Sequence, residues 1–299
     1  MKKHLSTIIL VLILIIGLSL LLYPTFSDWW NDLHSSYAIS NYDSIMANMS
    51  DDEYTHLFDA AMAYNMQLRQ LDYPLMYFDA VEGYEDLLNI TGTGIIGYIN
   101  IDKIDVQLPI YHGTSEGVLQ TAVGHLQGSS LPTGGEGTHC VLSAHRGLPS
   151  ARLFTDLDKM EVGDVFTLSV IDLTLTYRVD QILIVEPQQV EALYAVEGQD
   201  YCTLVTCTPY GVNSHRLLVR GTRIENEKEY RDIRVTADAA LIEPVLVAPF
   251  VATPILLALF INLMLPKPKK KNLEYLIYQM YFLYPQEHLP KKNLILILV

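Results

Sequence analysis

Hydrophobic residues follow three different patterns along the 299-residue chain. Residues 5–23 form an almost unbroken apolar run, long enough to cross a bilayer as one helix. Residues 28 to about 92 repeat apolar side chains at helical spacing, and the stretch 48–53 (Asn-Met-Ser-Asp-Asp-Glu) offers a capped helix start. From Gly97 onward the period becomes two, which is typical of strands. The pattern predicts a membrane helix, a helical region and a β domain, in that order.

The β part of the chain consists of short strand-like runs separated by turns that contain Gly or Pro. Little helical pattern lies between these runs. Many short strands in this arrangement favour a mainly β fold that closes, or nearly closes, into a barrel. The runs lie at residues 99–101, 104–110, 138–144, 165–170, 174–185, 203–207 and 217–224.

A second long apolar run, at residues 244–265, is followed directly by a lysine cluster at 267–271. Lys2 and Lys3 stand before the first run, so the positive-inside rule places both chain ends in the cytoplasm and the middle outside. The alternative for the second run is a buried core helix. The lysines that follow it favour the membrane, so we expect two transmembrane helices that flank the β domain.

The first apolar run is predicted to remain as an anchor. No cleavage site of small residues follows it; the next residues are Tyr23-Pro24-Thr25-Phe26 and then Trp29-Trp30, which suit the outer interface of a bilayer. The predicted organisation is a cytoplasmic start with the anchor, a helical region, a β-barrel, a second transmembrane helix and a cytoplasmic tail, at residues 1–27, 28–94, 95–235, 244–265 and 266–299.

The charge balance excludes one class of partner. The chain has 20 Lys and Arg against 34 Asp and Glu, a net charge of −14, and eight of the basic residues lie in the flanking segments. The part between the two apolar runs is therefore more acidic than the whole chain. Because phosphate binding needs a basic face, no nucleic acid is expected as a partner. The acidic surface either attracts lysine-bearing partners or only keeps the domain soluble.

The stretch around residue 207 carries the clearest chemistry. Residues 203–211 read Thr-Leu-Val-Thr-Cys-Thr-Pro-Tyr-Gly, a β-branched run that ends in a turn, and Arg216 stands at the entrance of the next run, 217–224. Cys207 therefore lies at a strand end, where a scaffold holds a reactive side chain rigidly and leaves it open to substrate. The hairpin is expected to bring Cys207 and Arg216 to the same rim.

A cysteine nucleophile also needs a base, because only the thiolate is strongly nucleophilic. Arg216 supplies charge for a developing oxyanion but cannot take a proton. His145 is the best candidate for the base, since the strand-like run before it ends there and a turn follows, as at Cys207. The sequence thus predicts a Cys/His pair assembled from separate strands, with Arg216 beside it.

These residues resemble the sortase transpeptidases of Gram-positive bacteria, and more closely the class C sortases, which assemble pili. The similarity rests on Cys207 with its flanking motif, on Arg216 and on His145-Arg146-Gly147, and it spans about residues 95 to 223. The resemblance implies a closed barrel of eight strands. Further stretches that support the subclass lie at residues 97–113, 124–132 and 147–157.

The resemblance also implies an activity, acyl transfer in two steps at the outer face of the cell membrane. Cys207 would be the nucleophile that attacks the Thr–Gly bond of a Leu-Pro-x-Thr-Gly-like sorting signal. His145 would act as general acid and base, and Arg216 would stabilise the oxyanion or clamp the substrate. The implied partners are pilin subunits, which carry such a signal and an acceptor lysine.

Class C sortases commonly place a lid before the barrel, with an Asp-Pro-aromatic motif whose acid approaches the arginine and whose ring covers the cysteine. This sequence reads Asp72-Tyr73-Pro74, so the order of the motif is changed. Asp72 and Tyr73 are the candidate lid residues. A plain loop and a lidless enzyme are the alternatives.

The remaining cysteines and the histidines favour no further chemistry. If the strands of Cys207 and His145 run parallel as neighbours, as in the sortase fold, Cys140 and Cys202 fall level with each other. They are then either bridged or, as we expect, two buried free thiols. No metal and no other cofactor is expected, because tight ligand spacing is missing around Cys140 and the histidines at 112, 125 and 139.

Two rival functions stay open at this point. One is a housekeeping sortase that attaches proteins to a peptidoglycan precursor, and the other is an inactive pilus scaffold that binds sorting signals without cleaving them. The intact set of Cys207, His145 and Arg216 speaks against the scaffold. A papain-like hydrolase is disfavoured, since its cysteine normally opens a helix whereas Cys207 ends a strand.

Overall fold

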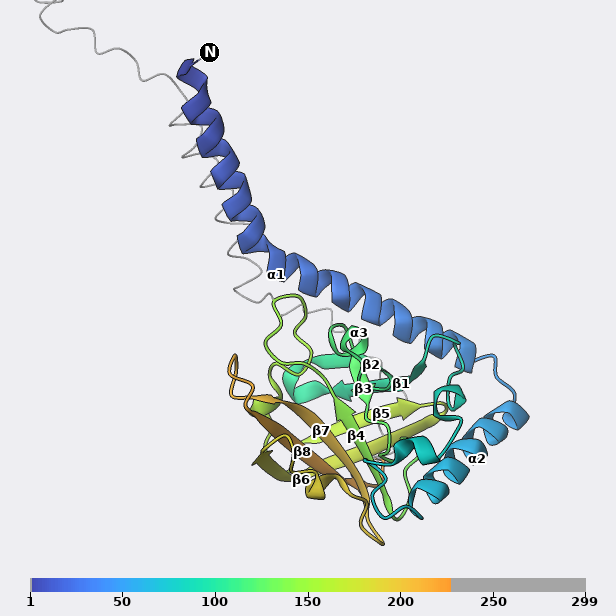
Figure 1. The fold of residues 1–299 in the computed structure, drawn as a ribbon. Helices are drawn as coiled ribbons and strands as arrows, with labels where there is room; N and C mark the ends of the chain where they lie inside the picture. Colours follow the sequence, from blue (N-terminus) through green and yellow to red (C-terminus); the bar gives the residue numbers. More distant parts are fainter. Residues whose placement is uncertain (1, 227–299) are drawn as a thin grey trace, which may run out of the picture. The chain divides into compact units, whose positions relative to one another are not determined.

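The computed structural model describes residues 2–226. These residues belong to the first of two units into which the chain divides, Met1–Ala237. The predicted second transmembrane helix at 244–265 and the predicted tail at 266–299 lie outside the described residues. The predicted organisation of the described part can be followed in Figure 1, where helices precede a barrel of strands.

Two long helices precede the strands. Helix α1 (Lys2–Met46) joins the predicted anchor and the start of the predicted helical region into one element, which continues through Pro24 and bends in Figure 1. A proline inside a helix removes a backbone hydrogen bond and commonly causes such a bend. Helix α2 (Asp51–Leu68) begins after Ser50, whose side chain accepts a hydrogen bond from the Glu53 amide in a capping box. The capped start predicted at 48–53 is therefore confirmed.

The strands form a closed barrel in the order β1-β2-β3-β4-β7-β8-β6-β5, which confirms the predicted mainly β fold of eight strands. Most neighbours are antiparallel, but β2 pairs with β3 and β4 pairs with β7 in parallel. The strands are β1 (Ile95–Ile101), β2 (Val106–His112), β3 (Val123–His125), β4 (Thr138–Ser143), β5 (Val165–Val170), β6 (Leu173–Val185), β7 (Asp200–Thr208) and β8 (His215–Ile224).

Short helical turns connect the strands and the long helices. Helix α3 has a single turn and precedes β3, a strand that the sequence pattern did not predict because its three residues are too few to show alternation. Within residues 28–92, which the sequence pattern indicated as helical, residues 84–86 form only a 3₁₀ turn. The short helices are η1 (Phe78–Ala80), η2 (Tyr84–Asp86), η3 (Asp102–Ile104), α3 (Glu116–Leu119), η4 (Leu157–Lys159) and η5 (Glu191–Leu193).

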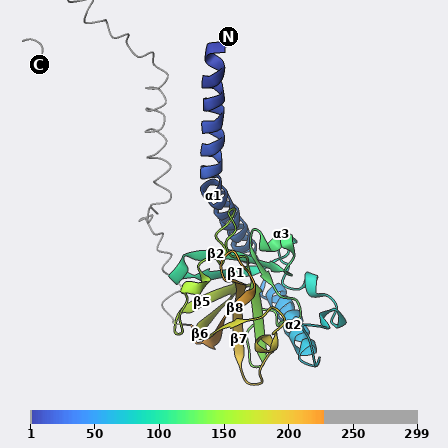
Figure 2. The same ribbon diagram turned by 60° about the vertical axis from the view of Figure 1, so that its left-hand side comes forward.

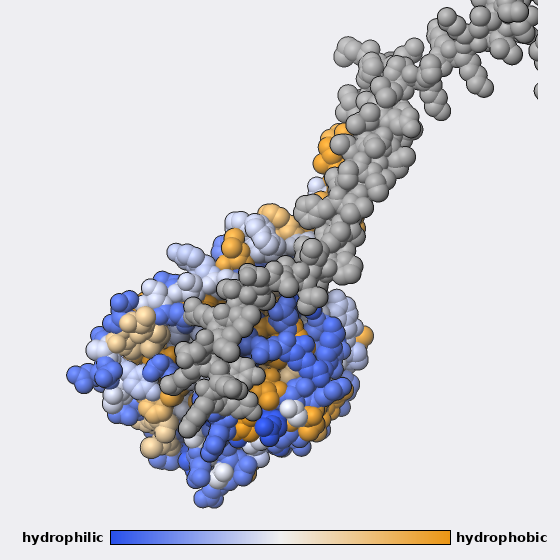
Figure 3. Space-filling model, turned by 180° about the vertical axis from the view of Figure 1, so that it is seen from behind, coloured by the Kyte–Doolittle hydropathy of each residue, from blue (hydrophilic) through white to orange (hydrophobic). Residues whose placement is uncertain are grey.

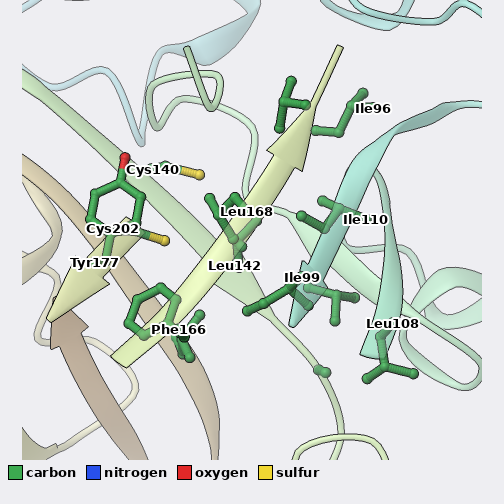
Figure 4. Packing of buried hydrophobic residues seen from close by; sticks show 14 of the residues in the cluster. Ile96, Ile99, Leu108, Ile110, Cys140, Leu142, Phe166, Leu168, Tyr177 and Cys202 are labelled. Atoms are coloured by element: carbon green, nitrogen blue, oxygen red, sulfur yellow. The ribbon is translucent and has the colours of Figure 1, made fainter. Parts of the chain in front are cut away.

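Strands β4, β7 and β8 bury residues on both of their faces, and the two faces have different neighbours. Even-numbered residues of β4 and β7, such as Leu142 and Leu204, point into the barrel and join its main core (Figure 4). Odd-numbered residues such as Val141 lie on the outside in a second cluster, which we call the outer apolar patch. It comprises Val141, Leu193 and Leu218, with Leu75, Leu126, Leu183, Val185, Ala192 and Val205 packed against them.

Helices α1 and α2 lie against the barrel (Figure 2), and buried polar contacts as well as apolar packing fix them to it. The Tyr42 hydroxyl of α1 donates to the Ile96 carbonyl at 3.1 Å and accepts from the Ile171 amide at 2.7 Å. The Asn65 side chain of α2 donates to the Leu131 carbonyl and accepts from the Leu131 amide. Hydrophilic residues cover much of the visible barrel surface in Figure 3, as the acidic composition leads one to expect.

Candidate active site

Cys207 lies at the end of β7, on the outer face of the barrel. It is half-buried, whereas Cys140 and Cys202 are buried. Because side chains alternate along a strand, Cys207 shares its face with Val205 of the outer apolar patch. The strand ends one residue later, at Thr208. The position confirms the predicted strand end, and it leaves the thiol accessible from outside the barrel.

Arg216 lies directly beside Cys207 on the neighbouring strand. The two residues are register partners in the antiparallel pair of β7 and β8, and on its other side Arg216 faces Val185 of β6. Its guanidinium donates to the backbone carbonyls of Asn213 at 3.1 Å and of His215 at 3.0 Å. These bonds hold the cation at the rim, where the hairpin between the two strands was expected to bring it.

His145 comes to the same rim from β4. The parallel register of β4 and β7 places Ser143 beside Val205, and the pairing continues because the Ala144 amide donates to the Val205 carbonyl at 3.2 Å. The Thr206 hydroxyl then donates to the Ala144 carbonyl at 2.9 Å. His145 is the next residue, in the segment that directly follows β4. The same register therefore places it level with Cys207, and neighbouring strands lie about 4.8 Å apart. Three strands thus converge on one thiol.

A carboxylate that sequence reasoning did not find lies next to the histidine. Nε2 of His145 is 3.5 Å from Oε1 of Glu116, the first residue of α3. The Glu116 side chain is 71% exposed and that of His145 is 27% exposed. The backbone of His145 is held separately, because its carbonyl accepts from the Phe154 amide at 3.2 Å. Glu116 therefore holds the imidazole on its solvent side.

The turn after Cys207 packs against the turn after His145. A side chain at Gly147 would place its Cβ 2.8 Å from the Tyr210 ring, so the two turns touch at a position that only glycine fits. Arg146 lies over the same ring at 5.9 Å and forms an ion pair with Asp158. The Arg146 side chain is only 9% exposed, so it is packed between the two turns and is not solvated.

The candidate lid residues lie in a turn between α2 and η1. The Tyr73 side chain is 55% exposed, and its carbonyl accepts from the amides of Met76 and Tyr77. Within residues 2–226, Asp72 has no ion pair or hydrogen bond with Arg216. Two residues further on, Leu75 packs against the outer apolar patch. The segment thus reaches the outer face of the barrel through Leu75.

The other cysteines and histidines have structural surroundings. Cys140 and Cys202 are register partners, as predicted, and both are free buried thiols. Burial raises the pKa of the Cys202 thiol well above its usual value. Burial also lowers the pKa of His139 to about 4, and its ring contacts the Tyr194 carbonyl and the Thr203 hydroxyl. No group of metal-ligating side chains was found in the described part of the chain.

Comparison with known proteins places this geometry in context. A family model described as the Sortase domain matches residues 99–224. The curated protein Sortase D of Bacillus subtilis (strain 168) is 29% identical over 131 residues, which cover 43% of this chain and 63% of that protein. The chain thus spans less than two thirds of the length of the curated relatives that it matches.

Solved structures match a larger share of the described chain. Sortase C1 from Streptococcus agalactiae is 51% identical with a TM-score of 0.60, covering 64% of this chain and 100% of that one. Sortase C from Streptococcus pneumoniae is 45% identical with a TM-score of 0.57, covering 64% and 97%. The resemblance to class C sortases is confirmed. We conclude that the chain belongs to the sortase family of cysteine transpeptidases.

Proposed function

We propose that this protein is a membrane-anchored cysteine transpeptidase that joins pilin subunits. It cleaves a Leu-Pro-x-Thr-Gly-like sorting signal between Thr and Gly and transfers the new acyl end to a lysine amine of another subunit. The observation that carries the proposal is the convergence of Cys207, Arg216 and His145 at one rim of the barrel. The pilin acceptor is supported by the Streptococcus pneumoniae relative, whose structure was described in terms of pilin substrate specificity.

In the first step, Cys207 is the nucleophile. Its Sγ forms a bond to the threonine carbonyl carbon, and the negative charge that develops on the carbonyl oxygen lies beside the Arg216 guanidinium on β8. His145 then gives a proton to the glycine nitrogen as the C–N bond breaks. The products are a thioester on Cys207 and the free amine of the cleaved peptide.

In the second step, the lysine amine attacks the thioester carbon. His145, now neutral, takes the proton that the amine loses, and the C–S bond breaks to release the Cys207 thiolate. An isopeptide bond results, and all three residues return to their starting state.

The half-buried edge of the outer apolar patch, at Val205 and Val185, supplies a surface for the sorting signal, whereas Val141 and Leu218 at the centre of the patch are already covered. The patch extends over β4, β7 and β8 on the same face as Cys207. Val205 precedes Cys207 by two residues on this face of β7, and Val185 is the register partner of Arg216. A Leu-Pro segment is apolar, so it gains free energy by covering such a surface. The threonine that follows then comes near the thiol.

Membrane anchoring is part of the proposal. Helix α1 contains the one stretch of the described residues that is long and apolar enough to span a bilayer, with a mean hydropathy of 2.6 and none of its window buried against the barrel. An anchored enzyme meets anchored substrates in one plane. The predicted cytoplasmic termini and the extracellular position of the barrel belong to the same proposal, since Lys2 and Lys3 precede the apolar run.

The experiment is mass spectrometry of the full-length protein in nanodiscs, incubated with a Leu-Pro-x-Thr-Gly peptide and a lysine-bearing pilin fragment. We expect a thioester on Cys207 and an isopeptide product, both absent from the Cys207→Ala variant. Cleavage of the peptide with no lysine adduct, together with transfer to a peptidoglycan precursor, would favour the housekeeping activity. Binding of the peptide with no covalent product would favour the scaffold.

A further inference from the structure

The second half of α1 has two contrasting faces. The face toward the barrel carries Ser35, Ile39 and Tyr42, which are buried. Further polar contacts lie along it, because Asp28 accepts a hydrogen bond from the Arg152 amide at 2.7 Å and Asn31 donates to the Ser150 carbonyl at 2.6 Å. This face fixes the helix to the barrel and to the loop that follows His145.

The opposite face is apolar and exposed. It carries Phe26, Trp29, Trp30, Leu33 and Tyr37, which we call the α1 stripe; their exposed fractions range from 49% for Trp30 to 77% for Tyr37. The first three rings pack against one another, with centroids 5.7 Å apart for Phe26 and Trp29 and 6.3 Å apart for Phe26 and Trp30. Large apolar surfaces of this kind mark an interaction site in a soluble domain.

The helical spacing of the α1 stripe shows that its side chains face away from the barrel. Each residue turns an α-helix by about 100°, so the five side chains of the stripe lie within a sector of about 100° around the helix axis. Ser35, Ile39 and Tyr42 fall about 180° away by the same reckoning. A helix that is packed on one side and apolar on the other lies between two surfaces. The barrel is one of them.

The chain itself points to the second surface. The stripe follows directly on the apolar span, within the same helix and just after Pro24, and Figures 1 and 2 show the bend that separates the two parts of α1. Tryptophan and tyrosine are the residues that favour the boundary between lipid chains and headgroups. An interfacial helix typically buries such a face to a shallow depth.

We propose that the α1 stripe lies in the outer interface of the bilayer, so that the second half of α1 is held between the membrane and the barrel. The inference rests on the proposed anchoring by α1. Its consequence concerns the active site, because Asp28 and Asn31 hold the loop at 150–152 that follows His145. The barrel is thereby fixed in one orientation, with the Cys207 rim at a constant height above the lipid.

The sequence offers a direct optical test, since Trp29 and Trp30 are the two tryptophans of the protein. Both lie near the span, so Tyr37 at the far end of the stripe is the decisive position. In a Trp29→Phe, Trp30→Phe background, we would compare Tyr37→Trp with His56→Trp, an exposed position on α2 that lies outside the stripe. Each full-length variant is reconstituted into vesicles of phosphatidylcholine and phosphatidylglycerol.

The readout is quenching by lipids brominated near the headgroup and by aqueous iodide. For Tyr37→Trp we expect loss of emission with brominated lipid, an emission maximum at shorter wavelength and protection from iodide; His56→Trp should show the reverse. Equal iodide quenching of both, in protein that floats with the vesicles, would overturn the interfacial stripe and leave the anchor intact.

Two other outcomes also decide against the proposal. Protein that does not float with the vesicles would refute the anchor, and the stripe proposal with it. Protection of Tyr37→Trp from iodide without quenching by brominated lipid, increasing with the ratio of protein to lipid, would show that a second copy of the chain covers the stripe. Flotation separates the first case from the second.

Discussion

Strand β7 carries two cysteines five residues apart, and their surroundings are opposite. Cys202 points into the barrel, has no exposed surface and lies beside Cys140 of β4 (Figure 4). Cys207 points outward at the strand end and lies beside Arg216 of β8. The same residue type therefore serves as a core side chain at one position and as the proposed nucleophile at the other.

The difference arises from alternation and depth along one strand. The two cysteines are five positions apart, and an odd difference places them on opposite faces of the strand; Cys207 stands where the strand ends. Burial raises the pKa of the Cys202 thiol and keeps it protonated and inert. In the proposed mechanism, the position that the backbone gives each thiol therefore decides which of them reacts.

Replacing the outer cysteine should have the largest effect. We expect Cys207→Ala to lower kcat/KM for a sorting-signal peptide by at least about 10³-fold, because the thioester cannot form. Peptide cleavage followed by mass spectrometry measures the loss. Cys202→Ala, on the inner face of the same strand, is the matched variant and should keep most of the activity. Comparable losses in both variants would mean that Cys207 is only structural.

Replacing Arg216, the cation beside the Cys207 thiol, should have the second largest effect on activity. Arg216→Lys retains a positive charge but loses the planar fork, and we expect kcat/KM to fall about 100-fold. Arg220→Lys is the control on the same strand face, since Arg220 bonds Asp180 at 3.0 and 2.8 Å and lies over the Tyr201 ring. Its effect should stay below about threefold. If the two variants behaved alike, the proposed oxyanion role of Arg216 would be lost.

The inner cysteine should matter for stability where the outer one does not. Cys202→Ser places a hydroxyl in the barrel core and should lower the free energy of unfolding by about 1–3 kcal/mol. Cys207→Ser, at the accessible strand end, should change it by less than about 0.5 kcal/mol. Far-UV circular dichroism during denaturation is the suitable probe, because both tryptophans lie in α1 and outside the barrel. Equal destabilisation would contradict the contrast between the faces.

Much of this contrast was predictable from the sequence. Period-two alternation located the long strands, and the turn after Thr208 placed Cys207 and Arg216 on one hairpin. The strand β3 was missed because three residues carry no period. The continuity of α1 through Pro24 was also missed, since a proline ordinarily signals a helix boundary in a sequence.

The parts of the site that were not predictable depend on contacts between distant segments. Glu116 reaches His145 from a one-turn helix, and nothing in the sequence around Glu116 distinguishes it from other exposed carboxylates. The packing of Tyr210 on Gly147 likewise needs the parallel pairing of β4 and β7, which sets the two turns side by side. Local patterns do not encode such pairings.

The contact between the two turns can be tested with a matched pair of glycines. Gly147 and Gly211 have similar positive φ angles of 75° and 74°; a Cβ at Gly147 would meet the Tyr210 ring, whereas a Cβ at Gly211 would have no atom within 4 Å apart from its chain neighbours. Both alanine variants incur the backbone cost of about 1 kcal/mol, and Gly147→Ala must also displace the ring. We expect Gly147→Ala to lower kcat/KM severalfold more than Gly211→Ala. Equal kinetics would remove the turn contact from the account of the site.

The candidate lid should give the smallest effect, and it extends the contrast of faces to the segment that packs on the outer face of the barrel through Leu75. Asp72 makes no ion pair with Arg216 within the described residues, whereas Leu75 packs against the outer apolar patch. If the segment closes the site, its hold depends mainly on Leu75. A partly buried leucine contact is worth about 1 kcal/mol, which corresponds to about fivefold in an opening equilibrium.

We therefore expect Leu75→Ala to raise the rate of peptide cleavage up to about fivefold, and Asp72→Ala to raise it by less than about twofold. Steady-state kinetics with a short sorting-signal peptide measures both. Met76→Ala is the control, because Met76 is 68% exposed on the same turn. A larger gain for Asp72→Ala than for Leu75→Ala would indicate that the acid, and not the leucine, holds the segment closed. Unchanged rates in all three variants would mean that Asp72 and Tyr73 belong to a plain loop and that the outer face is open to substrate without a gate.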